Sequence, residues 1–207
     1  IQHATSRQSN FVPGVIEHLT MADLSTDAKV KGLLLAGFCG RPELGVAVEK
    51  CITQTPLQGP DEIESAMWAV TQCCRDNLEK CLDVVLDAFT DLSPDRPSKT
   101  ELSERDKVLE FSGKRIAWDL PKSAVSAIVD QCQKRFDIAD YLSFFLYRVD
   151  SPIALSYWVR RRAEEMRENR KAGRKTWGDF FLHDEWRRSL RYGRIMSAES
   201  RQALWKI

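Results

Sequence analysis

The residue types that most often carry out catalysis gather once in the chain, in the segment FLHDEW. There His183, Asp184 and Glu185 stand side by side, and such side chains could transfer protons or bind a metal ion. Neighbouring residues on a helix point in different directions, so three consecutive polar residues are more typical of a solvated turn. The other two histidines, His3 in a polar leader and His18 in an apolar segment, belong to no recognisable nucleophile and acid set. We therefore expect no enzyme activity and assign no catalytic residue.

Phosphate and metal chemistry lack their usual motifs. A phosphate-binding loop needs glycines followed directly by Lys and by Ser or Thr, and the segment GFCG at 37–40 has neither the spacing nor that ending. It is typical instead of close helix packing followed by a helix stop. The six cysteines form no C-x-x-C pair and lie mostly in apolar helical patterns, which favours free thiols, a reducing cytosol and no bound zinc or cofactor. They are Cys39, Cys51, Cys73, Cys74, Cys81 and Cys132.

Three consecutive arginines at 160–162 raise the question of nucleic-acid binding. Successive helical residues are rotated by about 100°, so these side chains should point around most of the helix and not form one flat patch. Arg160 precedes Glu164 by four residues, and Arg161 precedes Glu165 by four. Because opposite charges at this spacing attract each other, the pattern is typical of a solvated helix.

The C-terminal quarter is basic, although the whole chain has a net charge of only +1. Residues 159–207 hold 14 Lys and Arg against 7 Asp and Glu, and residues 1–158 hold 17 against 23. Basic residues interleaved with aromatic ones suit RNA or single-stranded DNA. Trp, Tyr and Arg also anchor protein interfaces, and the aromatic spacing here fits buried helix faces. We expect a protein partner first and nucleic acid as the alternative, through Trp177, Trp186, Arg187, Arg188, Arg191 and Tyr192.

The elements that must position these residues are predicted to be helices. From Asp27 onward apolar residues recur at intervals of three and four, and no stretch alternates as a strand would. The first and third predicted helices begin at Asp27 and Asp61, and each is followed closely by a partner helix. This rhythm predicts an all-α fold of antiparallel helix pairs, stacked as a HEAT-like α-solenoid or an irregular helical bundle. The expected core residues are Leu33, Leu34, Val48, Val70, Leu82 and Val85.

One Pro-rich polar break, at 93–99, divides the chain. We expect helical-hairpin repeats over 1–92, a linker over 93–100 and a C-terminal helical region with a basic end over 101–207. No apolar run approaches the roughly 18 to 20 residues that cross a bilayer, and no signal segment stands at the start, so a cytoplasmic protein is expected.

Two segments carry a family resemblance. The segment RVDSPIALSYWVRRRAEE resembles the helix starts of HEAT-like repeats, with Ser151 as cap and Pro152 in the first turn. The tail RIMSAESRQALWKI is similar to the C-terminal helical regions of bacterial NACHT or STAND-type ATPases. The resemblance implies a sensor, scaffold or autoinhibitory solenoid attached to an ATPase outside this chain. The first residue, Ile1, is not Met, and Ile207 ends the chain within a helical pattern, so we expect a fragment of a larger protein.

Together these features predict a non-enzymatic helical repeat module for protein recognition or scaffolding within a larger cytosolic protein. The alternative is a helical domain that binds nucleic acid through its basic C-terminal quarter.

Overall fold

The computed structural model describes residues 11–108, 120–135 and 151–173, and positions 138, 139, 142, 146, 198, 199 and 202. No β-strand occurs among these residues, and the expected all-α class is confirmed. None of the helices in the described part is long and apolar enough to cross a membrane. The elements are α2 (Phe11–Leu19), α3 (Thr26–Cys39), the 3-10 helix η1 (Pro42–Leu44), α4 (Gly45–Gln54), α5 (Gly59–Cys73), α6 (Leu78–Asp91), α9 (Lys122–Lys134) and α11 (Pro152–Lys171).

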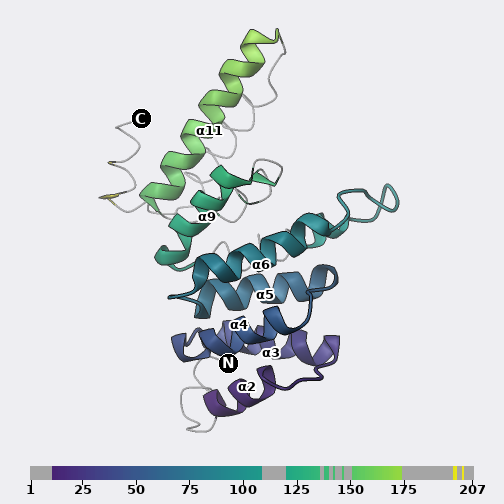
Figure 1. Cartoon of the computed structure of the whole chain (residues 1–207). Helices are drawn as coiled ribbons and strands as arrows, with labels where there is room; N and C mark the ends of the chain where they lie inside the picture. Colours follow the sequence, from purple (N-terminus) through teal and green to yellow (C-terminus); the bar gives the residue numbers. More distant parts are fainter. Residues whose placement is uncertain are drawn as a thin grey trace.

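The helices are stacked in the order of the sequence, from α2 at one end to α11 at the other (Figure 1). Contacts join α2 to α3, α4 to α5, α5 to α6, α6 to α9 and α9 to α11. The most extensive contact is between α3 and α5, the first members of the two expected helix pairs. Packing between successive pairs is what a stack of helical hairpins requires, since each pair leaves an apolar face uncovered. The HEAT-like arrangement itself stays a prediction.

Helix α3 shows how local sequence sets an element's ends. The Ser25 hydroxyl accepts a hydrogen bond from the Ala28 N–H at the start, as expected of an N-cap. At the end, Gly40 adopts a left-handed φ of 58°, and its N–H donates to the Ala36 carbonyl. A Cβ atom added to Gly37 would lie 2.0 Å from Cδ1 of Trp68. The interpretation of GFCG as close packing and a helix stop is thus confirmed.

The expected core is largely confirmed, because five of its six residues are fully buried and Leu34 is half-buried. Helix α5 lies between α3 and α6 and is buried on most of its sides. The buried face of α3, however, is displaced by one residue from the apolar pattern of its sequence. That pattern favours Val30, Leu33, Leu34, Gly37 and Phe38, whereas the buried positions are Lys29, Gly32, Leu33, Ala36 and Gly37.

The expected linker follows the end of α6, and residues just beyond the linker bond back to its start and to the end of α6. The Glu104 carboxylate accepts from the Ser93 N–H at 2.9 Å, and the Arg105 guanidinium donates to the Leu92 carbonyl at 2.9 Å. The same guanidinium lies 5.8 Å from the centre of the Phe89 ring. Beyond this loop α9 packs back on α6, and buried residues before and after it join one core cluster. The division into 1–92, 93–100 and 101–207 stays a prediction.

Candidate protein-binding groove

The six residues expected to bind a partner, Trp177, Trp186, Arg187, Arg188, Arg191 and Tyr192, lie outside the described residues, as do His183, Asp184 and Glu185. The described helices carry one groove, one buried polar cluster and one acidic row that bear on function.

A groove of about 680 Å³ lies between α9 and α11. We call it the α9–α11 groove. Its volume falls within the range of pockets that hold small ligands or anchoring side chains. The α11 residues that line it form two rows with a spacing of four, so one continuous face of the helix borders the groove over three turns. The groove is lined by Val129, Cys132 and Gln133 of α9 and by Pro152, Ile153, Ser156, Tyr157, Arg160, Arg161 and Glu164 of α11.

Helix α11 begins where the sequence predicts, but the expected capping hydrogen bond is missing. Ser151 is the N-cap in extended conformation and Pro152 occupies the first turn, as expected, but the Ser151 side chain makes no capping hydrogen bond. Ala154 is buried, whereas the neighbouring Ile153 is 48% exposed. Ile153 therefore lies at the edge of the groove, where apolar surface remains accessible.

The groove changes character along its length. Its first part is lined by apolar groups of Ile153, Tyr157 and Val129, and its far part carries charged groups. Arg160 and Arg161 border the same groove, which is compatible with the expected divergence of the arginine run around the helix. Adjacent residues can flank one groove, because it spans more than a single row of side chains.

The expected ion pair between Arg160 and Glu164 does not form among the described side chains, although both line the groove. Exposed pairs at this spacing gain little free energy in water, so their side chains remain available to other partners.

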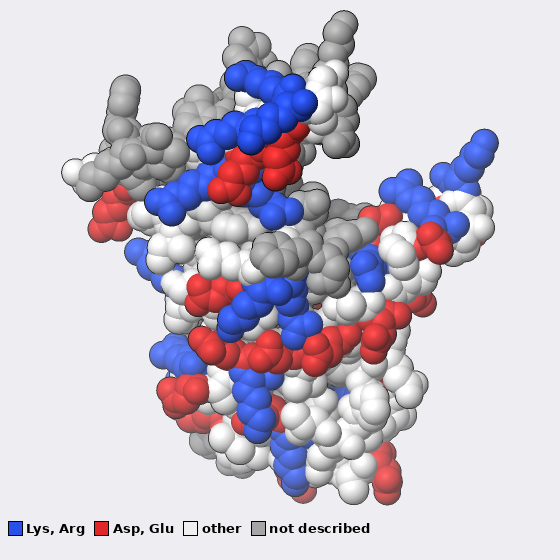
Figure 2. Space-filling model, turned by 45° about the horizontal axis from the view of Figure 1, so that its top comes forward, with Lys and Arg blue, Asp and Glu red and all other residues white. Residues whose placement is uncertain are grey.

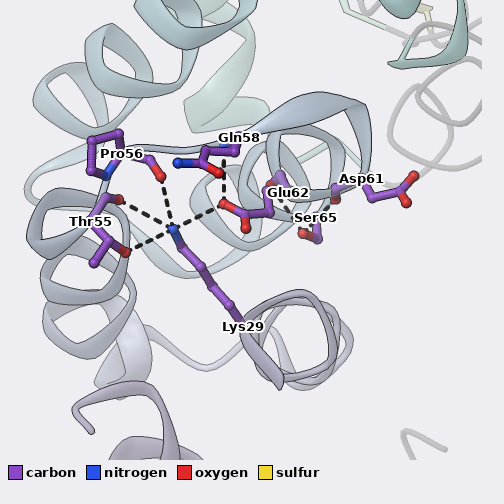
Figure 3. Close-up of polar contacts among 7 residues, drawn as sticks. All are labelled: Lys29, Thr55, Pro56, Gln58, Asp61, Glu62 and Ser65. Carbon is purple, nitrogen blue, oxygen red and sulfur yellow. Dashed lines mark hydrogen bonds and ion pairs between the residues drawn. The ribbon is translucent and has the colours of Figure 1, made fainter. Parts of the chain in front are cut away.

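A second cluster, around Lys29, is buried and was not expected from the sequence. The Lys29 Nζ atom donates to the Thr55 carbonyl, the Thr55 hydroxyl, the Pro56 carbonyl and the Glu62 carboxylate, at 3.0 to 3.4 Å (Figure 3). The same Glu62 oxygen accepts from the Gln58 N–H at 3.0 Å. The ammonium thus joins α3 to the α4–α5 loop and to the first turn of α5. Because neighbouring groups satisfy it fully, the cluster has a structural role.

His18 and the buried thiols of Cys51 and Cys73 do not form a reactive site either. The His18 ring donates from Nε2 to the Ala28 carbonyl at 2.9 Å, which ties α2 to α3. All six cysteines are thiols and not disulfides, as expected, and five of them are buried. Burial raises the pKa of Cys51 to about 11 and that of Cys73 to about 12, so neither forms a reactive thiolate near neutral pH. Within the described ranges, no three His, Cys, Asp or Glu residues are arranged to hold a metal ion.

The outer face of α6 carries a row of acidic residues. Glu79, Asp83, Asp87 and Asp91 are exposed and follow each other at intervals of four, which places them along one side of the helix. Arg135 of α9 pairs with two of them, at 3.3 Å from Asp83 and 2.7 Å from Asp87. On the face drawn in Figure 2, a band of acidic side chains crosses the middle of the molecule, and acidic and basic groups alternate above it. The described surface therefore presents no continuous basic face there.

No family model, curated protein or solved structure matches the chain.

Proposed function

We propose that this chain is a non-enzymatic helical module that recognises protein, in keeping with a HEAT-like repeat region or scaffold within a larger cytosolic protein. The observation that carries the proposal is the α9–α11 groove, in which accessible apolar side chains lie beside two arginines. Protein interfaces combine a desolvated apolar centre with Arg and Tyr in this way. The buried thiols support a reducing compartment, where cysteines stay unpaired.

The charges of the described surface favour protein over nucleic acid. A polyanion gains affinity from a run of basic side chains that follows its phosphates. Here Glu164 borders the groove next to the arginines, and the acidic row of α6 lies farther along the stack. These carboxylates would repel a phosphate backbone, whereas a protein with mixed charges can pair with both signs.

Nucleic-acid binding is the second candidate, because residues 159–207 carry twice as many basic as acidic residues. It would depend on Arg187, Arg188 and Arg191 for phosphate contacts, and on Trp177, Trp186 and Tyr192 for base stacking.

Two binding measurements on the whole chain test the proposal. The first is selection of a displayed library of random peptides, followed by titration of the enriched peptides. The second is fluorescence anisotropy of labelled single-stranded RNA and DNA over a range of salt concentrations. We expect enriched peptides that bind in the micromolar range or tighter, and only weak oligonucleotide binding at about 150 mM salt.

The opposite pattern would overturn the proposal. It consists of no enriched peptide together with submicromolar RNA or DNA binding, whose logarithm falls linearly with the logarithm of salt concentration. Replacing Arg187, Arg188 and Arg191 with Ala would then abolish oligonucleotide binding without loss of helicity, and would flatten that slope.

A further inference from the structure

We propose that the α9–α11 groove binds one amphipathic helix of a partner protein, with the apolar face of that helix on Ile153 and Tyr157 and one carboxylate on Arg160, beside the positive charge of Arg161. The inference rests on the proposed function and names the chemistry of the partner.

The shape of the groove argues for a helix as its occupant. Its lining on α11 runs from Pro152 to Glu164, which corresponds to about 18 Å along a helix axis. A partner helix of about three turns matches that length. Two packed helices also leave between them a furrow into which the side-chain ridge of a third helix fits.

The apolar part supplies the attraction for the partner's apolar residues. Ile153 is 48% exposed, whereas Val129, on the α9 side of the groove, is buried at 7%. The accessible apolar surface therefore lies on the α11 side and is bordered by the half-buried Tyr157. Covering an isoleucine and a tyrosine with Leu or Phe side chains removes apolar area from water on both partners.

The charged part specifies the sign of the partner's polar residue. The Arg160 guanidinium offers several N–H donors, and a carboxylate can accept two of these at once. Arg160 is exposed, and the half-buried Arg161 adds a second positive charge beside it. Glu164 lies one turn farther on and would repel a second anion there. The groove therefore suits one acidic residue followed by a neutral or basic one.

The test uses a displayed library of 14-residue helices in which only the residues of one face are randomised. The whole chain serves as the target, in wild-type form and as the variants Ile153→Asp, Arg160→Glu and Arg170→Glu. Ile153 and Arg160 are exposed, so their replacement should leave helicity unchanged, which circular dichroism checks. Arg170 is an exposed arginine on α11 outside the groove and provides the matched control.

We expect enriched helices with apolar residues over two turns and an Asp or Glu in the next. Ile153→Asp should weaken their binding at least about tenfold, and Arg170→Glu should change it less than about twofold. Selection on Arg160→Glu should exchange the acidic residue for Lys or Arg. A variant that merely failed to fold would lose binding and would not reverse the charge preference.

Two results would overturn the inference, and they differ in what they say about the proposed function. If the enriched helices bind wild type and both groove variants equally, the groove is not their binding site, although the chain still recognises protein. If no helix is enriched and oligonucleotides bind tightly, both the groove inference and the proposed function are contradicted.

Discussion

The Nζ atom of Lys29 lies 3.0 Å from Oε2 of Glu62, and neither side chain is more than 4% exposed. The two residues come from α3 and α5, the helices with the most extensive mutual contact. An ion pair in the interior loses its hydration, and only close geometry and further hydrogen bonds offset that cost. Here the loop acceptors Thr55 and Pro56 provide those bonds, so the pair fixes how α3, the loop and α5 fit together.

Removing one member of this pair should destabilise the fold strongly. Glu62→Gln leaves a buried ammonium without its counter-charge, and Lys29→Met leaves a buried carboxylate, so each should cost about 3 to 5 kcal/mol in urea denaturation. The double variant should cost clearly less than the sum, because it leaves no unpaired charge. As a control, Lys31→Met breaks the exposed pair with Asp27 on the same helix and should cost less than about 1 kcal/mol. If the losses of the two single variants simply add in the double variant, Lys29 and Glu62 do not stabilise each other as a buried ion pair.

The burial of Leu82 can be compared with that of Leu35 by the same substitution. Leu82 is fully buried in α6, so Leu82→Ala should reduce the free energy of unfolding by about 2 to 5 kcal/mol. Leu35 is 39% exposed on α3, so Leu35→Ala should cost less than about 1 kcal/mol. Chemical denaturation measures both values. Equal losses would show that the two side chains share one environment.

The raised pKa of Cys51 predicts a loss of stability at high pH. Burial raises this pKa to about 11 in the folded state, whereas the unfolded thiol ionises near its ordinary value of about 8.5. The stability that the buried, neutral Cys51 thiol contributes is therefore fully present below about pH 8.5 and is lost as pH rises through the folded pKa of about 11. Wild type should lose more stability than Cys51→Ala between about pH 8 and pH 10.5 in urea denaturation. Parallel pH profiles for the two proteins would rule the shift out.

Arg135 should stabilise the contact between α9 and α6 in a salt-dependent way. It pairs with Asp83 and Asp87 and also donates to the Gln131 side chain at 3.1 Å. Arg135→Gln should cost about 1 kcal/mol at low salt and less at about 0.5 M salt, because added ions screen exposed carboxylates. Arg75→Gln, at an exposed arginine of the α5–α6 loop, is the control and should change little. A loss that does not depend on salt would point to packing by the arginine stem instead.

Helix class and most of the core were predictable because they depend on local periodicity. The apolar stripe of α5 recurs at three and four residues, and Ile63, Met67 and Val70 are all buried as the spacing indicates. Helix ends also follow local rules, as Gly40 and Pro152 show. Asn77 is the N-cap of α6, but its side chain donates to Glu49 of α4 and makes no capping bond.

The features that the sequence could not predict depend on contacts between residues far apart in the chain. Lys29 has the spacing of the buried stripe of α3, yet a lysine is usually taken as exposed, and its acceptors lie 26 to 33 residues away. The centre of α3 is apolar on several sides, so periodicity alone left the buried side of that helix undetermined. The α9–α11 groove forms only where two helices meet, and neither segment alone indicates that Val129 and Ile153 line one groove.

The packing of the Trp68 ring on Gly37 bears on how this fold can diverge. Since a single added methyl group at position 37 would overlap the indole, the two sites cannot accept substitutions independently. A related sequence with Ala or Ser at the glycine position should carry a smaller residue than tryptophan at the other. Divergence at this contact would therefore pass through paired replacements, and the two alignment columns would covary although 31 residues separate them.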